Sequence, residues 1–136
     1  MPNPPDSEVR KMLQKAKVIA VVGHSDNPFR TSYQIAAFLR QVGYKVYPVN
    51  PTITEVNGER SYPSVADVPE AVDIVDVFRR SEFLEDVVED AIKAGAKNIW
   101  AQIGVYDEAA GEKAAQAGMG VVLDRCIKIE HLRLVR

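Results

Sequence analysis

An apolar run that breaks at a glycine and continues through a polar loop constrains the fold more than any other stretch of this sequence. Residues 17–22 read KVIAVV, Gly23 follows, and a polar loop leads into a helical pattern near Ser32. A strand buried on both faces reads as a continuous hydrophobic run, and a glycine at its end lets a ligand approach the backbone. The helix that follows directs free N–H groups and its positive dipole end toward that position. The stretch therefore predicts a βα unit with an anion-binding loop.

The composition is compatible with one globular domain. The chain has 136 residues, of which 46% are hydrophobic, and this is enough to bury a core. We expect a single domain over residues 1–136, with the proline-rich residues 1–6 as a disordered tail. The net charge of −2 gives no whole-protein attraction to nucleic acid or to an anionic membrane. We therefore expect neither partner, and an anion site has to be built from local basic residues.

Further features of the sequence indicate which class of protein this is. They are its cysteine and histidine content and the start of the chain. Cys126 is the only cysteine, which excludes an intramolecular disulfide and favours a reducing compartment. No apolar stretch reaches the ~18 residues that span a bilayer, and the start MPNPPD lacks the basic and apolar regions of a leader peptide. We predict a soluble, cytoplasmic protein. Two histidines and one cysteine are too few for a zinc site, so we expect no metal.

Three joins of one kind indicate an alternating fold. In each, a helical pattern ends at a glycine (Gly43, Gly95 or Gly118) and a strand pattern follows at once. Strands that alternate with helices imply right-handed crossovers and a parallel sheet. We predict a Rossmann-like, doubly wound α/β fold, a single three-layer domain whose five parallel strands have the order 3-2-1-4-5. The expected strands are residues 17–22, 45–49, 73–78, 97–101 and 120–123; the expected helices are 6–16, 32–42, 81–94, 107–117 and 124–132, with a short turn over 64–67.

Arginine is concentrated in the segments that follow the predicted strands. In a doubly wound sheet the ligand lies beyond the carboxyl ends of the strands, where the strand order reverses. Three of the five segments there contain arginine, namely Arg30, Arg79 with Arg80, and Arg125. Each charge-assisted hydrogen bond to a phosphate contributes roughly 1.5–3 kcal/mol. This distribution indicates an anionic, phosphorylated ligand.

Two common phosphate-binding motifs are absent. The dinucleotide fingerprint G-x-G-x-x-G is missing because no further glycine follows Gly23 in its loop, and strand two ends at Asn50-Pro51 rather than at an acidic residue. No stretch matches the P-loop pattern G-x-x-x-x-G-K-[ST]. A dinucleotide-binding regulator therefore stays as an alternative that these absences weaken.

Five segments, taken in order, resemble a known family. They read VGHSDNPFRTSY at 22–33, PVNP at 48–51, VDVFRR at 75–80, QIGV at 102–105 and DRCIKIEH at 124–131. They look like the small stand-alone CoA-binding proteins, which are similar to the N-terminal domain of the succinyl-CoA synthetase alpha subunit. The resemblance covers nearly the whole chain from about Glu8 onward.

The resemblance implies a domain that binds coenzyme A or a short acyl-CoA across the strand ends. The first loop would receive the phosphates, the segments after strands two and three would surround the nucleotide end, and the segment after strand four would border the pantetheine arm. The synthetase works through a phosphorylated histidine in a second domain that this chain does not reach, so we expect a binding or regulatory module without catalysis of its own. A homodimer is compatible with so small a domain. The implied ligand-binding residues are Gly23, His24, Ser25, Arg30, Ser32, Tyr33, Asn50, Pro51, Phe78, Arg79, Arg80, Gln102, Ile103 and Gly104.

Plainer interpretations compete at several of these positions. Arg79 and Arg80 can also start a solvated helix and pair with Glu82 or Glu85. Arginine at the positive end of a helix is unfavourable without an anion, which favours ligand contact. His24 stands where we expect an apolar residue in many relatives, so the resemblance assigns its side chain no clear role. A rival function is a small enzyme that acts on a phosphorylated metabolite, with His24 and Asp26 as acid and base.

Two residues near the end of the chain have similar alternatives. Cys126 is either a small buried residue or a thiol that meets the CoA thiol and forms a reversible mixed disulfide. Arg125 either contacts the ligand or pairs with the adjacent Asp124. His131, beside Glu130 on a helical segment, is expected to pack or to cap.

Overall fold

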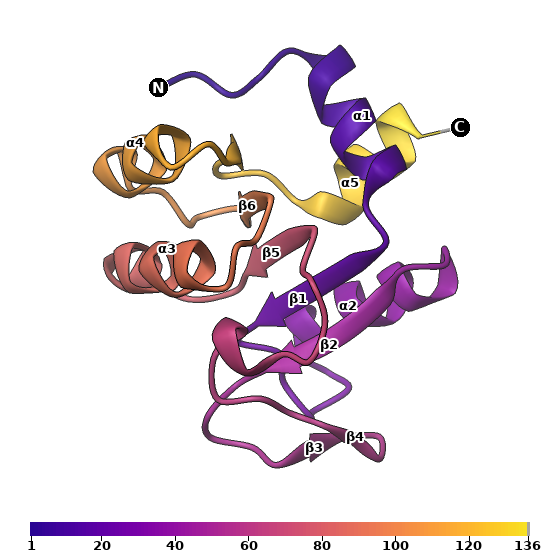
Figure 1. The fold of residues 1–136 in the computed structure, drawn as a ribbon. Coiled ribbons are helices and arrows are strands. Elements are labelled where there is room, and N and C mark those ends of the chain that lie inside the picture. The colour runs from indigo at the N-terminus through magenta and orange to yellow at the C-terminus, as the bar shows by residue number, and fades with distance from the viewer. Residues whose placement is uncertain (136) are drawn as a thin grey trace.

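A five-stranded parallel sheet forms the centre of the structure. The computed structural model describes residues 1–135, and in it the strands have the order β2-β1-β5-β6-β7 (Figure 1). All four pairings in this sheet are parallel. This confirms the predicted Rossmann-like α/β fold with five parallel strands. The strands are β1 (Val18–Val22), β2 (Lys45–Val49), β5 (Ile74–Val77), β6 (Asn98–Ala101) and β7 (Gly120–Val122).

The predicted strand order was wrong at one strand. Numbered along the chain, the five strands have the order 2-1-3-4-5 rather than 3-2-1-4-5, because β5 pairs with β1, with Ile19 opposite Ile74, and does not lie outside β2. Pro48 supplies the reason. Its carbonyl accepts a hydrogen bond of 3.0 Å from the Tyr62 N–H at the outer side of β2, the side on which proline has no donor of its own. A strand with proline at this position suits the edge of a sheet.

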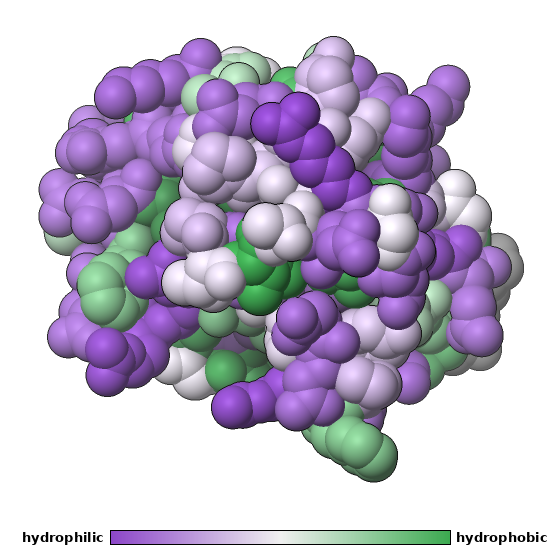
Figure 2. All heavy atoms as spheres, turned by 90° about the horizontal axis from the view of Figure 1, so that it is seen from below, coloured by the Kyte–Doolittle hydropathy of each residue, from purple (hydrophilic) through white to green (hydrophobic). Residues whose placement is uncertain are grey.

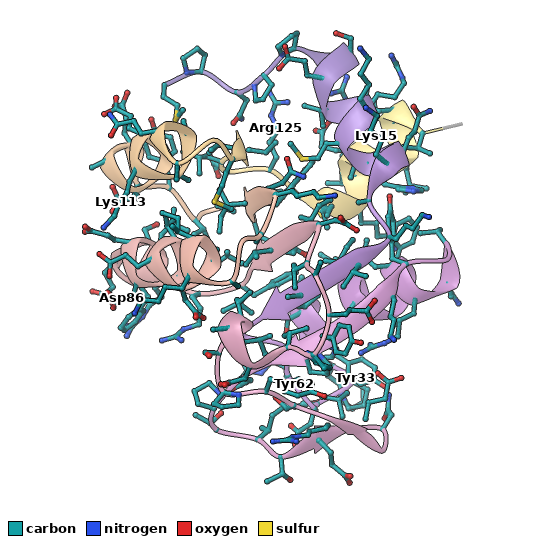
Figure 3. All side chains as sticks on the ribbon, viewed as in Figure 1. Lys15, Tyr33, Tyr62, Asp86, Lys113 and Arg125 are labelled. Atoms are coloured by element: carbon teal, nitrogen blue, oxygen red, sulfur yellow. The ribbon has the colours of Figure 1, made fainter. Side chains whose placement is uncertain are left out.

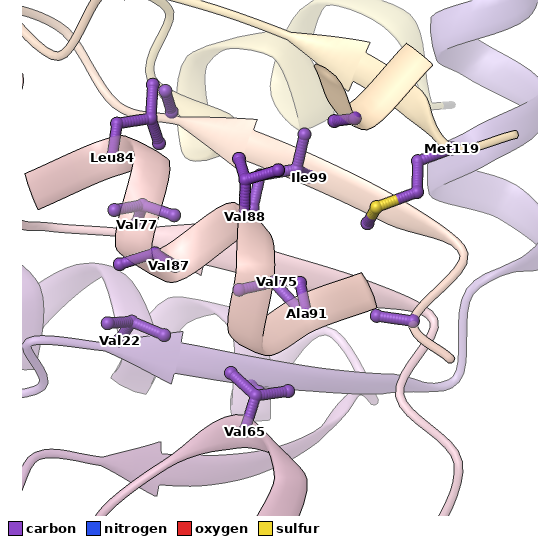
Figure 4. Packing of buried hydrophobic residues seen from close by; sticks show 14 of the residues in the cluster. Val22, Val65, Val75, Val77, Leu84, Val87, Val88, Ala91, Ile99 and Met119 are labelled. Carbon is purple, nitrogen blue, oxygen red and sulfur yellow. The ribbon is translucent and has the colours of Figure 1, made fainter. Parts of the chain in front are cut away.

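Helices cover both faces of the sheet and make the three layers. One face is covered by α1 (Asp6–Lys15), α2 (Thr31–Gln41) and α5 (Ile127–Leu134), the other by α3 (Leu84–Lys93) and α4 (Glu108–Gln116). Side chains of β1, β5 and β6 pack against Leu84, Val87, Val88 and Ala91 of α3 (Figure 4). Lys113 of α4 extends to α3, where it pairs with Glu89 (Figure 3). The predicted helices are therefore confirmed, with small shifts of their ends.

The connection between β2 and β5 contains more structure than we predicted. The short turn expected over residues 64–67 is present as the 3₁₀ helix η1 (Val65–Asp67). A second 3₁₀ helix, η2 (Ser81–Phe83), lies outside this connection, between β5 and α3. A small hairpin of β3 (Glu55–Val56) and β4 (Glu59–Arg60) stands where a loop was expected. Asn57 and Gly58 between them have φ values of 50° and 84°. Asn-Gly is a strong hairpin signal, so the sequence did indicate this turn.

The beginning of the chain lies against α4 and the end of β7. Asn3 donates to the Leu123 carbonyl at 2.9 Å and accepts from its N–H at 2.8 Å. The predicted disordered tail over residues 1–6 overlaps α1 at Asp6, and disorder of the residues before it stays a prediction. No helix within residues 1–135 is long and apolar enough to cross a membrane. The face seen from below Figure 1 is mostly hydrophilic, with apolar side chains exposed in small areas, one of them in a central hollow (Figure 2).

Candidate functional site

The carboxyl ends of β1 and β5 meet at Gly23. The chain leaves β1 for α2 on one face and β5 for α3 on the other, so these two strands form the switch point where ligands bind in such folds. Gly23 has φ +86°, and its N–H donates to the Val49 carbonyl at 2.9 Å. A Cβ at this position would lie 2.5 Å from the Phe78 carbonyl oxygen. Glycine therefore lets the loops after β1 and β5 lie in direct contact.

His24 is a structural residue of the first loop. Its side chain is fully buried, Nδ1 lies 2.8 Å from the Ser25 carbonyl oxygen and Nε2 lies 3.1 Å from Nη1 of Arg40. A neutral ring satisfies both partners by donating from Nδ1 and accepting at Nε2. Burial lowers the pKa of His24 to about 4. The charge of Arg40 lowers it too, whereas the hydrogen bond to Ser25 opposes the shift. Only the backbone of His24 is left for contact with a ligand. A buried, neutral His24 side chain does not fit the acid or base role that the alternative enzyme function assigns to it.

The rest of the first loop is held by its own polar groups. The Ser25 N–H donates to Oγ of the buried Ser32 at 3.0 Å, and Oγ of Ser25 accepts from the Asn27 N–H at 3.0 Å. Arg30, the residue before α2, is exposed and forms no ion pair within residues 1–135. The first turn of α2 contains no acidic residue. These features leave the positive end of α2 open to an anion.

Asn50 and Tyr33 brace neighbouring loops. The Asn50 amide donates to the His24 carbonyl at 3.0 Å, and its Oδ1 accepts from both the N–H and the hydroxyl of Thr52, at 3.0 and 2.7 Å. The Tyr33 hydroxyl accepts from Asn57 of the hairpin at 2.8 Å (Figure 3). Both side chains are engaged within the protein, which explains their positions without a ligand. Their predicted contact with the nucleotide stays a prediction.

Arg79 and Arg80 have different surroundings. The guanidinium of Arg79 lies 4.5 Å from the centre of the Phe83 ring, and Arg79 makes no ion pair with a carboxylate in the part of the chain that the structure describes. Arg80 lies 5.4 Å from the same ring and pairs with Glu82, Nε to Oε1 3.1 Å, while its side chain is 79% exposed. Arg80 therefore fits the alternative interpretation, in which the arginine is solvated and paired with a glutamate. Arg79, like Arg30, therefore has its charge available for an anion.

Two clefts border Arg79. The smaller, of 160 Å³, lies toward α3, and the larger, of 440 Å³, lies toward α2 and α5. Larger hollows exist elsewhere, such as one of 570 Å³ at the outer edge of β2, but Lys45 there is paired with Glu70, and none of the predicted ligand residues lines it. The smaller cleft is lined by Val22, Val49, Pro51, Pro63, Arg79, Phe83, Asp86, Val87 and Asp90, and the larger by Thr31, Ile35, Phe78, Arg79, Arg80, Gln102, Ile103, Gly104, Val105 and Cys126.

The clefts bring together part of the predicted set. Pro51, Phe78, Arg79, Arg80 and the segment 102–104 line them as expected. Sequence reasoning missed the apolar walls, notably Ile35, Pro63 and Phe83. Phe83 had a signal, since an aromatic residue shortly after two arginines can stack on them. Ile35 looked like any other residue of a buried helix face.

Gln102 and Cys126 lie at the α5 end of the larger cleft. Gln102 is 5% exposed, and its Oε1 accepts from the Ile127 N–H at 3.1 Å at the start of α5. Cys126 is half-buried, so it is neither a core residue nor freely exposed. His131 packs edge-on against the rings of Phe38 and Tyr44, as predicted, with centroids 5.5 and 5.7 Å away. Within residues 1–135, no three His, Cys, Asp or Glu side chains are placed to hold a metal ion.

Asp76 is a buried acid for which the sequence analysis found no role. Its side chain is fully buried, and neither carboxyl oxygen has a hydrogen-bond partner among residues 1–135. In register it stands between Val21 and Trp100, two residues before Phe78 on the same face of β5. Burial raises the pKa of the Asp76 carboxyl well above its usual range. The raised pKa favours the neutral acid at this buried position in β5.

Comparison with known proteins adds an independent line of evidence. A family model described as "CoA binding domain" matches residues 17–132. An uncharacterized protein of Bacillus subtilis, YneT, is 42% identical over 131 residues, which are 96% of this chain and 97% of that protein. The alpha subunit of acetate–CoA ligase [ADP-forming] II of Pyrococcus furiosus is 33% identical over 82 residues, and the match spans 60% of this chain but only 18% of the ligase subunit.

Solved structures share all or most of this fold. A hypothetical protein from Pyrococcus horikoshii has a TM-score of 0.94 and 41% identity, covering 98% of this chain and 94% of that one. A protein from Thermus thermophilus has a TM-score of 0.91 and 38% identity, covering 96% and 99%. The acetyl-coenzyme A synthetase 1 of Ca. Korarchaeum cryptofilum aligns with a TM-score of 0.67 and 35% identity over 77% of this chain and 25% of its own.

Proposed function

Because this chain belongs to the CoA-binding domain family, we propose that it binds coenzyme A or a short acyl-CoA at the carboxyl ends of its strands. It acts as a binding or regulatory module without catalysis of its own. Arg79 carries this proposal, since this arginine, which has no carboxylate partner in the described part of the chain, borders both clefts beside the switch-point Gly23. A cytoplasmic location and a homodimer stay predictions.

The two clefts suit the two ends of such a ligand. The smaller one has flat apolar walls at Pro51, Pro63 and Phe83, which suit the adenine ring. The larger one extends from Arg79 past Gln102 to Cys126 and suits the flexible pantetheine arm. The phosphates then lie between them, over Arg79 and near the open positive end of α2. This placement puts the negative charge of the ligand at basic groups in a protein whose net charge is −2.

Arg79→Ala is expected to weaken CoA binding by roughly 1.5–3 kcal/mol, because it removes a charge-assisted contact to phosphate. Arg80→Ala is the matched control with a smaller effect, since Arg80 is exposed and paired with Glu82. Calorimetry with CoA, 3′-dephospho-CoA and NAD measures both. We expect heat with CoA, weaker binding without the 3′-phosphate, and weaker binding of both at high salt. Equal affinity for CoA and NAD, or an Arg79→Ala variant with unchanged affinity, would contradict the proposal.

Cys126 is expected to form a reversible mixed disulfide when the protein meets CoA disulfide. The Cys126 thiolate attacks one sulfur of the CoA disulfide, the S–S bond breaks, and one CoA leaves as a thiolate that takes up the proton. Intact mass should increase by one CoA moiety and return to its starting value with reductant. Glutathione disulfide, which lacks the nucleotide, should react more slowly, and Cys126→Ser should not react. An unmodified wild-type mass would rule this reaction out.

A further inference from the structure

One wall of the larger cleft is a loop that is buried at Gln102 and Val105 and exposed between them. The chain from Gln102 to Val105 follows β6 and lines the cleft. Ile103 within it is 64% exposed, and Gly104 has φ +84° with open space where a Cβ would be. Exposed segments with few buried apolar contacts open easily unless polar contacts hold them. The shape of this wall therefore depends on its hydrogen bonds.

Asp124 holds this loop from the side of β7. Its Oδ1 accepts the Gly104 N–H at 2.7 Å, a hydrogen bond assisted by the charge of the carboxylate. Asp124 itself has φ +57°, a left-handed conformation that aspartate and asparagine tolerate better than most residues. Such a conformation persists only where the surroundings maintain it. Here it directs the carboxylate across to the neighbouring loop.

Ser81 holds the same loop from the side of β5. Its hydroxyl donates to the Gly104 carbonyl at 3.2 Å and accepts the Tyr106 N–H at 2.9 Å. Ser81 directly follows Arg80 and begins η2. The loop after β6 is thus tied on one side to Asp124 and on the other to the segment that carries Arg79.

We propose that Asp124 and Ser81 are positioning residues that keep the loop 102–106 in the shape that receives the pantetheine arm. This inference rests on the proposed function. Neither residue lines a cleft, so both act through Gly104 and not by touching the ligand. Their effect should therefore be confined to ligands that carry a pantetheine arm.

The test compares CoA with adenosine 3′,5′-bisphosphate, which has the nucleotide end and no pantetheine arm. Asp124→Gly keeps the left-handed backbone and removes the acceptor, whereas Asp124→Asn keeps a side-chain oxygen that can accept the Gly104 N–H. We expect Asp124→Gly to lower CoA affinity about tenfold, the size of one lost hydrogen bond, and to leave adenosine 3′,5′-bisphosphate binding unchanged. Asp124→Asn should bind both like the wild type.

Ser81→Ala should act in the same direction as Asp124→Gly. Ser64→Ala is its matched control, because Ser64 precedes η1, bonds Asp67 at 2.8 Å and lines neither cleft. A variant Asp124→Gly that loses both ligands equally, or neither, overturns this inference while CoA binding by the wild type still supports the proposed function. Absence of CoA binding by the wild type overturns the proposed function and this inference with it.

Discussion

Replacing Gly23 with alanine is expected to lower the free energy of unfolding by about 2–5 kcal/mol, the sum of a left-handed backbone for a residue with a side chain and an overlap with fixed backbone. The new Cβ would lie 2.5 Å from the Phe78 carbonyl oxygen, which cannot move aside without shifting the end of β5. Because Arg79 directly follows Phe78 at the end of β5, the same shift should also weaken CoA binding. Denaturant unfolding and calorimetry measure the two effects.

Gly118→Ala is the matched control for this prediction. Gly118 has φ +88°, close to the +86° of Gly23, but nothing lies within 4 Å of the position of its Cβ. It should therefore show the backbone cost alone, about 1–2 kcal/mol, with no change in CoA affinity. If the two variants were equally stable, close approach between β1 and β5 would not be the reason for glycine at position 23.

Asp76→Asn is expected to stabilise the protein at neutral pH, by an amount that grows with pH. Burial raises the pKa of Asp76 in the folded state well above its ordinary value of 3.8. Above that value the unfolded chain releases the proton while the folded protein retains it, so wild-type stability falls by about 1.4 kcal/mol per pH unit until the folded pKa is reached. Asparagine does not ionise and removes this loss. When unfolding is measured from pH 4 to pH 8, the free energy of unfolding of Asp76→Asn should increase relative to that of the wild type.

Two further variants separate the causes. Asp76→Leu has the same number of side-chain heavy atoms and also removes two unpartnered oxygens, which should stabilise by a further ~1–3 kcal/mol at all pH values. Asp73→Asn should behave oppositely. Partial burial raises the pKa of Asp73, but the hydrogen bonds from the backbone N–H groups of Lys17 and Val18 and the charge of Lys97 together lower it by more. Its carboxylate stabilises the fold at neutral pH, and the effect is lost in acid. A pH-independent difference at Asp76 would contradict the prediction.

Local patterns were enough to predict the layers of the fold. The strand β1 is buried along its whole length, and its continuous apolar run showed this in advance. Gly43, Gly95 and Gly118 each end a helix with positive φ, as the three repeated joins indicated. The order of the strands was not recovered, because it depends on which edges can pair. Pro48 was the one residue that indicated an edge strand, and the prediction used it only as part of a strand pattern.

The structure brings part of the predicted residue set together, and ligand binding there stays a prediction. Gly23, Arg79 and the segment 102–104 come together because parallel strands bring their carboxyl ends to one edge. His24 and Asn50 lie at the same edge, yet their polar atoms are used by Arg40, Ser25 and Thr52. Residue type shows that a side chain can form hydrogen bonds, and it does not show with which group.

The sequence by itself determined the alternation of strands and helices and carried the family resemblance. The alternation follows from the spacing of apolar residues and from glycines, which act over a few neighbouring positions, and the resemblance rests on five short segments in order. Only the tertiary structure decided that, within residues 1–135, Arg79 has no carboxylate partner while Arg80 is paired, and that the buried Asp76 carboxyl has no hydrogen-bond partner there. Such properties depend on groups far apart in the chain, because burial and the distance between charges exist only after folding.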